Sequence, residues 1–191
     1  MKRKLNVLIA CEESQAECLA FRELGHNAYS CDIQSARYNK DYHIKGDVSP
    51  LLDGQTKFTT ESGCTIDVFR WDLIIAHPPC TYISKVGLPW MKIDGKIQPE
   101  RFAKMKEARE FFFHCLNAKA HYVAVENPIP MKLAQLPRPT CFLEPSWFGV
   151  KYTKKTLYWL KNLPPIMPKL IYPNPKCFTT SSRGKYRSRT F

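Results

Sequence analysis

The sequence predicts a single α/β domain with a doubly wound, mostly parallel sheet. Its short apolar runs are nearly continuous and do not alternate with polar residues, which is typical of strands buried on both faces. Helix-like stretches separate these runs, as the crossover connections of a parallel sheet require. The length of 191 residues suits one such domain, because single domains commonly run ~100–200 residues.

The first part of the chain supplies two expected strands and one helix. A strand over residues 6–11 precedes a helix over residues 13–24, in which apolar residues recur at helical spacing. Gly25 stands where a left-handed residue commonly ends a helix. A second strand over residues 28–31 ends at Asp32, which completes one strand-helix-strand unit.

The same pattern continues along the chain. We expect further strands over residues 71–76, 122–125 and 156–160. Residues 99–117 form a predicted long helix with Pro99 in its first turn. The residues of this helix that are expected to face the core are Phe102, Met105, Phe112 and Leu116.

Loops and proline-rich chain connect these elements. Residues 54–65 and 85–98 are expected to be loops, and the second loop is placed to cover a site. Ten of the fifteen prolines fall within residues 128–175, so the last third is expected to be mostly irregular. We expect residues 1–175 to form the domain and residues 176–191 to form a basic tail.

The chain is strongly basic, with a formal net charge of +12 from 29 Lys and Arg against 17 Asp and Glu. Such an excess is typical of a surface that binds a polyanion, so DNA or a nucleotide phosphate is the expected partner. Charge that serves solubility alone is the alternative. The tail holds five Lys or Arg and no acid, which suits either an arm against phosphates or a solvated segment.

The eight cysteines show no CxxC pair and no regular spacing, and several lie inside apolar runs. This pattern indicates reduced thiols and a cytoplasmic protein. It also lacks a zinc-binding spacing, so no metal is expected. Since no stretch approaches the ~18 apolar residues of a membrane span, no membrane partner is expected either. The sequence leaves the oligomeric state open.

Polar residues that could take part in chemistry stand at the ends of four expected strands: Cys11 to Ser14, Asp32, His77 to Cys80, and Glu126-Asn127. In doubly wound sheets, ligands bind beyond the carboxyl ends of the strands. Cys80 follows one buried run within His-Pro-Pro-Cys, where two prolines fix the backbone and direct the thiol into the crevice. Glu126 follows a neighbouring run and is expected to place a carboxyl group beside that thiol. A buried structural Cys and a capping Glu are the alternative readings.

A thiol and a carboxyl group at one crevice suit addition to a pyrimidine base. Carbon 5 of cytosine is a poor nucleophile until a thiolate adds to carbon 6, and protonation at N3 favours that addition. Cys80 would form the covalent bond, and Glu126 would supply the proton. Nearby cations such as Lys154 would favour the thiolate.

Several stretches, taken in chain order, resemble the DNA cytosine-5 methyltransferases. Ala76-His-Pro-Pro-Cys-Thr-Tyr-Ile-Ser84 is similar to their catalytic loop, and Glu126-Asn127 is similar to their Glu-Asn-Val motif. Asp32 stands where the family places an acid on the cofactor ribose, and Gly46-Asp47 resembles its Gly-Asp pair. Lys154-Lys155 precede a strand, as do the basic residues with which the family holds its target nucleotide. The overall pattern looks like a short branch common in bacteriophage genomes.

The resemblance implies a Rossmann-like fold of the class I S-adenosylmethionine-dependent methyltransferase type, with methyl transfer to cytosine in DNA. Cys80 and Glu126 are then the expected catalytic residues. The residues expected to bind S-adenosylmethionine are Cys11, Glu12, Ser14, Asp32, Asp47 and Pro78. The residues expected to bind the substrate are Ser84, Asn127, Lys154 and Lys155.

Two departures from the family pattern leave other functions open. The first strand-to-helix turn, Cys11-Glu-Glu-Ser14, holds none of the glycines that let the backbone approach the cofactor. Full-length members also carry a separate recognition domain, which we do not expect in the 31 residues that follow Leu160. The alternatives are a non-catalytic protein that binds nucleotides or DNA, and an enzyme that modifies free pyrimidine nucleotides.

Overall fold

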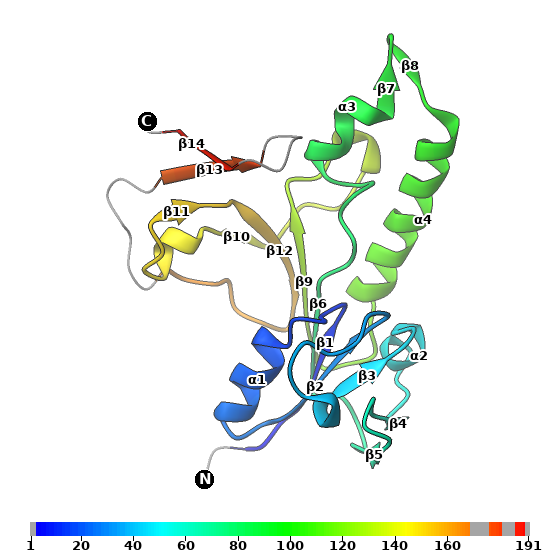
Figure 1. Cartoon of the computed structure of the whole chain (residues 1–191), viewed down its shortest axis with the longest axis vertical. Helices are drawn as coiled ribbons and strands as arrows, with labels where there is room; N and C mark the ends of the chain where they lie inside the picture. Colours follow the sequence, from blue (N-terminus) through cyan, green and yellow to red (C-terminus); the bar gives the residue numbers. More distant parts are fainter. Residues whose placement is uncertain (1–2, 169–175, 181–185, 190–191) are drawn as a thin grey trace.

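A seven-stranded sheet forms the centre of the computed structural model, which describes residues 3–168, 176–180 and 186–189 (Figure 1). Its strand order is β10-β12-β9-β6-β1-β2-β3. The strands are β1 (Asn6–Ala10), β2 (Asn27–Asp32), β3 (His43–Lys45), β6 (Leu73–Ala76), β9 (Tyr122–Pro128), β10 (Cys141–Leu143) and β12 (Thr156–Lys161). The five strands from β3 to β9 are parallel, while β12 runs antiparallel to both of its neighbours. The predicted Rossmann-like, mostly parallel sheet is therefore confirmed.

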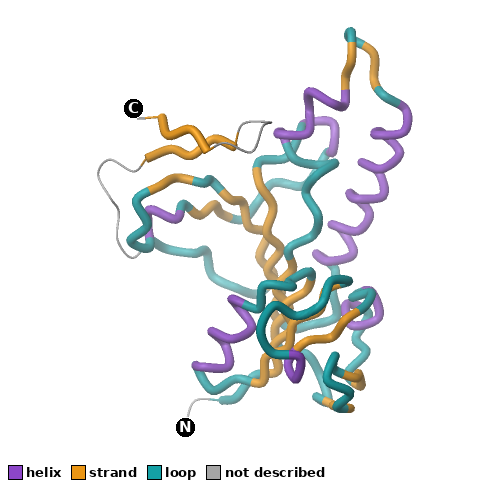
Figure 2. The backbone as a smooth tube through the Cα atoms, viewed as in Figure 1, coloured by secondary structure: helices purple, strands orange, loops and turns teal. Residues whose placement is uncertain are grey.

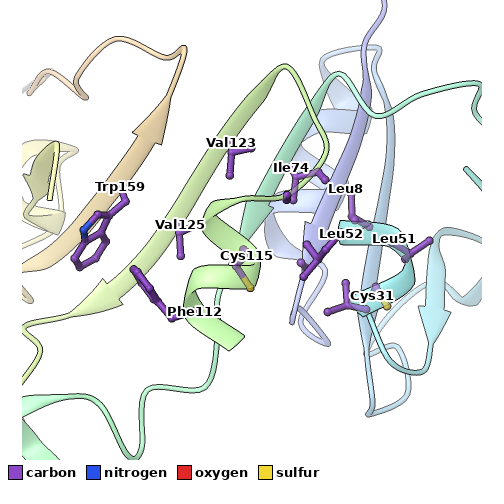
Figure 3. Packing of buried hydrophobic residues seen from close by; sticks show 14 of the residues in the cluster. Leu8, Cys31, Leu51, Leu52, Ile74, Phe112, Cys115, Val123, Val125 and Trp159 are labelled. Carbon is purple, nitrogen blue, oxygen red and sulfur yellow. The ribbon is translucent and has the colours of Figure 1, made fainter. Parts of the chain in front are cut away.

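Helices cover both faces of this sheet, because successive side chains of each buried strand point to opposite sides. Val7 and Ile9 of β1 pack in a cluster with Cys18 of α1 (Ala16–Glu23). Leu8 and Ala10 belong to the larger cluster on the other face, under α2 (Ser49–Leu52) and α4 (Pro99–Leu116). Figure 3 shows part of that larger cluster, which the four predicted inward residues of the long helix join.

The first helix begins later than the sequence predicted. It starts at Ala16 and not at residue 13, because Gln15 has a left-handed backbone (φ 57°) that a right-handed helix does not allow. Its carboxyl end agrees better with the prediction, since Gly25 has the positive φ (88°) of a left-handed cap. Leu24, whose position matched the helical spacing, is 74% exposed and does not join the core.

Both segments that were predicted to be loops contain short hairpins. β4 (Lys57–Thr59) pairs with β5 (Thr65–Asp67), and β7 (Lys92–Ile93) pairs with β8 (Lys96–Ile97). Asp94 and Gly95 both have positive φ, as a two-residue hairpin turn requires. The second hairpin follows η2 (Lys85–Gly87) and α3 (Leu88–Met91) and projects beyond the first turn of α4 (Figure 1). The loop prediction for these residues was therefore wrong.

The last third is more regular than its proline content predicted. It contributes β10 and β12 to the central sheet, and it also contains β11 (Tyr152–Thr153), β13 (Lys176–Thr180) and β14 (Tyr186–Arg189). These last three strands form a small sheet in which β13 lies between β11 and β14. The structure also contains short 3-10 turns at η1 (Lys40–Tyr42), earlier in the chain, and at η3 (Lys132–Ala134) and η4 (Pro145–Trp147).

The predicted basic tail is only partly covered by the structure. Residues 176–180 and 186–189 form the strands β13 and β14, while residues 181–185 and 190–191 lie outside the described residues. The division of the chain at residue 175 stays a prediction. Across residues 3–168 and the two described tail segments, no helix is both long enough and apolar enough for a membrane span.

Candidate active site

The sheet register places His77 and Glu126 side by side at the carboxyl edge of the sheet. Ala76 of β6 pairs with Val125 of β9, and both point into the core under α4. The next residue on each strand therefore turns to the opposite face, where α1 lies. On β12, Tyr158 pairs with Glu126 and continues the same row.

The predicted strand over residues 122–125 placed Glu126 and Asn127 beyond its end. In the structure, both residues lie inside β9. β9 continues to Pro128 because β12 supplies antiparallel partners, with Tyr158 opposite Glu126 and Leu157 opposite Asn127. This extension corrects the sequence prediction. It also gives the Glu126 carboxyl group a rigid backbone within a paired strand.

Cys80 is held at the same edge by the turn that follows β6. The backbone N–H groups of Ile83 and Ser84 both donate to the Cys80 carbonyl oxygen, at 3.1 and 2.9 Å. Two further backbone hydrogen bonds, Lys85 N to Ile129 O at 2.7 Å and Met131 N to Ile83 O at 2.8 Å, tie this segment to the chain after β9. The loop that carries Cys80 is thus fastened to the segment that directly follows β9, the strand that carries Glu126. Figure 2 shows the strands of the sheet in orange and the loops that connect them in teal.

Burial and several nearby side chains shift the pKa of the Cys80 thiol. Partial burial raises the pKa of the Cys80 thiol, and the nearby charge of Glu126 raises it further. The charge of Lys154 and a hydrogen bond from Ser84 act in the opposite direction. Glu126, Lys154 and Ser84 are therefore near enough to Cys80 to influence its ionisation, and the roles of all four residues stay predictions.

His77 bridges two carboxylates at the base of this cluster. Its Nε2 lies 3.2 Å from Glu17 Oε1 on α1, and its Nδ1 lies 3.4 Å from Glu126 Oε2 on β9. Burial of the ring opposes its charge, but the hydrogen bonds to Glu126 and Glu17 outweigh burial and raise the pKa of His77 to about 10. The sequence did not single out Glu17. Its position on the first turn of α1, facing the end of β6, was the available signal.

The glycine-free first turn adopts the backbone that glycine would favour. Cys11 and Gln15 both have left-handed φ angles, of 61° and 57°. Glu12 is only 6% exposed, and its carboxylate accepts the backbone N–H groups of Glu17 and Cys18 at the start of α1, at 2.7 and 3.3 Å. Burial raises the pKa of this carboxyl group. The Glu12 side chain thus satisfies backbone N–H groups at the start of α1 and closes the turn against this helix.

The other polar groups of this turn are also engaged. The Glu13 carboxylate pairs with Arg37 at 2.8 Å, and Ser14 Oγ lies 3.4 Å from Glu12 Oε1. Glu13 is therefore paired with a cation, while the Glu12 carboxylate is held by backbone N–H groups. Among the residues predicted to bind a cofactor, Glu12 and Ser14 stabilise the turn itself, and Pro78 is buried.

Asp32 and Asp47 flank Cys11 at the ends of β2 and β3. Burial and the charges of these two carboxylates raise the pKa of Cys11 to about 12. Asp32 Oδ1 accepts the backbone N–H of Gln34 at 2.8 Å, and no hydrogen bond to its Oδ2 is present within the described residues. Asp47 Oδ1 accepts from the backbone N–H and the hydroxyl of Ser49, and both bonds lower the pKa of Asp47.

The predicted substrate residues fall into a buried pair and an exposed pair. Ser84 is 4% exposed and Asn127 is fully buried, with its Nδ2 donating to the Pro128 carbonyl oxygen at 2.6 Å. Because Asn127 is buried, it is better placed to support the backbone at this edge of the sheet than to contact a substrate directly. Lys154 and Lys155 are exposed just before β12, and Lys155 Nζ lies 4.1 Å from the ring centroid of Phe142.

A cavity of about 460 Å³ lies at the opposite edge of the sheet, before the strands β1, β6 and β9 begin. Arg3, Arg70, Lys119 and His121 line it, and Asp72 pairs with both arginines. Because this cavity is at the amino-terminal edge, it is separate from the Cys80 cluster. Within the described part of the chain, no group of His, Cys, Asp and Glu is arranged to hold a metal ion.

Comparisons with known proteins find similarity among solved structures alone. No family model matches the chain, and no curated protein matches it. Among solved structures, the chain is similar to one described as a candidate DNA modification methyltransferase encoded within an E. coli prophage. The identity is 14%, the TM-score is 0.46, and the match covers 82% of this chain and 46% of that one. The chain thus spans about half the length of that protein.

Proposed function

We propose that the chain is a DNA cytosine-5 methyltransferase-like enzyme in which Cys80 is the nucleophile and Glu126 is the acid. One observation carries the proposal. The thiol comes from the turn after β6 and the carboxyl group from the adjacent parallel strand β9, and they lie close enough for the Glu126 charge to raise the pKa of Cys80. Both groups can therefore reach one heterocycle at the same edge of the sheet.

The two side chains have complementary tasks on a cytosine that is flipped out of the helix. The Cys80 thiolate forms a bond to C6, and the π electrons of the C5–C6 bond move onto C5, which becomes nucleophilic. Glu126 enters this step in its protonated form, gives the proton to N3 so that the ring does not accumulate negative charge, and leaves the step as a carboxylate. Lys154 favours the thiolate, as its lowering effect on the pKa of Cys80 indicates.

The cofactor would bind along the neighbouring strand ends. Asp32 fits a ribose because one of its oxygens is engaged by Gln34 and the other faces no donor in the described residues. Asp47 and the left-handed backbone of Cys11 lie beside it. When bound there, S-adenosylmethionine supplies an electrophilic methyl group.

The direct test combines product analysis with covalent trapping. DNA incubated with the protein and isotopically labelled S-adenosylmethionine is expected to yield labelled 5-methyldeoxycytidine in nucleoside mass spectrometry. In the presence of S-adenosylmethionine, DNA that contains 5-fluorocytosine is expected to form a covalent adduct with the wild type and none with Cys80→Ala, because the fluorine on C5 blocks the elimination that would release Cys80. Cys64→Ala is the matched control, because Cys64 is an exposed free cysteine outside the cluster. An adduct that persists in Cys80→Ala would exclude Cys80 as the nucleophile.

The same assay separates the other two functions. Labelling of dCMP but not of duplex DNA would indicate an enzyme that modifies free nucleotides. Binding of DNA without labelled product or adduct would indicate a protein that only binds nucleic acid. The closed first turn, in which Glu12 caps α1, is the observation that favours this last alternative.

A further inference from the structure

His77 occupies a position that the proposed chemistry does not yet use. The ring lies between α1 and β9, with Glu17 Oε1 at 3.2 Å from Nε2 and Glu126 Oε2 at 3.4 Å from Nδ1. The exposed fractions of the three side chains are 24% for His77, 38% for Glu17 and 19% for Glu126. This contact joins the helix on one face of the sheet to the proposed acid on its edge.

We propose that Glu17 and His77 form a positioning pair that holds the imidazole ring as a cation and thereby fixes the Glu126 carboxyl group toward the base. The proposal rests on the proposed function for the role of Glu126. The geometry of the pair itself does not depend on that function.

The Nδ1 contact with Glu126 is a hydrogen bond, and the Nε2 contact with Glu17 is an ion pair at 3.2 Å, so a charged ring suits both carboxylates. A neutral imidazole has one N–H, so its other nitrogen would present a lone pair to a carboxylate oxygen. A doubly protonated ring donates to both carboxylates, and a charged donor strengthens each hydrogen bond. The raised pKa of His77, about 10, agrees with this arrangement. Glu17 Oε2 is buried without a hydrogen-bond partner in the described residues, so His77 is the contact that compensates the charge of this acid.

The surrounding groups make the charge of His77 important. Glu12 faces it from the first turn, and Tyr158 from β12 lies near both Glu17 and Glu126. Beyond Glu126 stand Cys80 and the cation Lys154. If His77 became neutral, its ring could donate to only one of the two carboxylates, and three acids would face one another around an uncharged ring.

The pair therefore predicts a specific pH dependence. The active form of the ring is the cation, which is lost as pH rises through its pKa. With both carboxylates present, that loss occurs near pH 10, above the working range. Glu17→Gln removes one negative charge and one charged acceptor, so the pKa of His77 is expected to fall by at least about one unit. The variant should then lose activity progressively on the alkaline side of neutrality.

The first measurement is an NMR titration of the His77 ring in the protein without ligands. Its resonance can be assigned by its absence in His77→Gln. We expect no titration of the wild-type ring between pH 6 and pH 8.5, and a titration midpoint within or near this range in Glu17→Gln. A wild-type midpoint near the ordinary histidine value, or an unchanged midpoint in Glu17→Gln, would overturn the proposal.

The second measurement is the rate of adduct formation with 5-fluorocytosine DNA as a function of pH. His77→Gln is expected to slow the reaction about 10- to 100-fold with DNA affinity nearly unchanged, because only the positioning of Glu126 is lost. Glu23→Gln, an exposed acid on the last turn of α1, is the matched control. Equal rates in wild type and His77→Gln would overturn the role of His77. If the wild type formed no adduct, the proposed function would fail, while the NMR titration would still test whether Glu17 holds His77 as a cation.

Discussion

Gln15 combines a left-handed backbone with a fully buried side chain. Its φ is 57°, and its amide group makes hydrogen bonds to the backbone of Tyr38 and Asn39 and to Ser30. A left-handed backbone costs about 1–2 kcal/mol for a residue with a Cβ atom. The side chain offsets this cost because it satisfies the two N–H groups of the segment after β2.

Substitution of Gln15 should separate these two contributions. Gln15→Ala keeps the backbone cost and loses the hydrogen bonds, so we expect a loss of about 2–4 kcal/mol in the free energy of unfolding. Gln15→Gly loses the same hydrogen bonds but relieves the backbone, so it should be more stable than the Ala variant by about 1 kcal/mol. Urea denaturation measures both values.

The neighbouring Glu13 provides the control for this comparison. Glu13→Gln removes a surface ion pair with Arg37, whose side chain is 58% exposed, and should cost less than about 1 kcal/mol. A Gly variant that is less stable than the Ala variant would contradict the assigned backbone cost.

The reactivity of Cys80 should report the charges around it. Burial and Glu126 raise the pKa of the thiol, so at pH 8 the thiolate fraction should be smaller than for an ordinary cysteine. Glu126→Gln removes a negative charge, which lowers that pKa and should speed alkylation by iodoacetamide several-fold. Lys154→Gln removes the opposing charge and should slow it. Peptide mapping by mass spectrometry follows the rate at Cys80 as a function of pH.

The exposed Cys64 is the internal reference in each sample, because it lies outside the cluster and should react equally in all three proteins. If Glu126→Gln slowed the alkylation of Cys80, the two groups would not interact through charge as the structure indicates.

The sequence located the candidate residues better than it located their partners. Motifs placed Cys80, Glu126 and Asp32 at strand ends, since such ends follow directly from the apolar runs. His77 received little weight because its contacts depend on which face of the sheet it occupies. That face is set by the register between β6 and β9, together with the packing of α1, and neither is a local property of the chain.

Among the elements, the segment between Cys80 and α3 depends on one glycine. A Cβ atom on Gly87 would lie 2.5 Å from the backbone oxygen of Thr81, which is closer than such atoms can approach. The close approach closes the loop that carries Cys80. Gly87→Ala must therefore shift this loop, even though the glycine has an ordinary φ of −78°.

We expect Gly87→Ala to reduce adduct formation at Cys80 at least about tenfold, because displacement of a reacting group by about 1 Å can cost 10²-fold. The fold should persist, since the parallel core strands do not include this loop. Val86→Ala is the matched control, because Val86 is 64% exposed in the same turn. Circular dichroism checks the fold, and equal adduct rates in both variants would show that the loop tolerates the shift.

The elements that the sequence missed are those fixed by pairing. The Asp94-Gly95 turn signal was present in the sequence, but its flanking strands are only two residues long and lack an alternating pattern. β9 extends past its apolar run through Glu126 and Asn127 because β12 offers hydrogen-bond partners there. Polar residues interrupt an apolar run, so the run alone could not predict that the strand continues through them.

At the scale of the whole molecule, the strand order could not be derived from local patterns. The apolar runs predicted parallel strands, and the structure confirms four of the predicted strands as parallel, namely β1, β2, β6 and β9. The fifth parallel strand, β3, was not predicted, and the strand predicted over residues 156–160 is the antiparallel β12. Pairing of β6 between β1 and β9 brings His77 and Glu126 together, yet these residues are 49 positions apart. The antiparallel insertion of β12 likewise depends on contacts that only the assembled sheet provides.

Lysine side chains lie at both edges of the sheet, which leads to a prediction for the proposed DNA binding. Lys154 and Lys155 are exposed beside the Cys80 cluster, whereas Lys119 lines the cavity at the amino-terminal edge. If duplex DNA binds at the carboxyl edge, each lysine contact with a phosphate contributes about 0.9 to the slope of log K against log salt concentration. The double variant Lys154→Gln, Lys155→Gln should therefore lower the slope by about 2.

Fluorescence anisotropy with a labelled duplex, measured over a series of salt concentrations, gives this slope for each protein. Lys119→Gln is the control and should leave it unchanged, although it reduces the net charge of +12 by one. The comparison separates a localised interface from attraction by total charge, because a general field would respond to each lost charge equally. Equal decreases per lysine at the two edges would mean that DNA is not held beside Cys80, and the proposed base flipping into that site would lose its support.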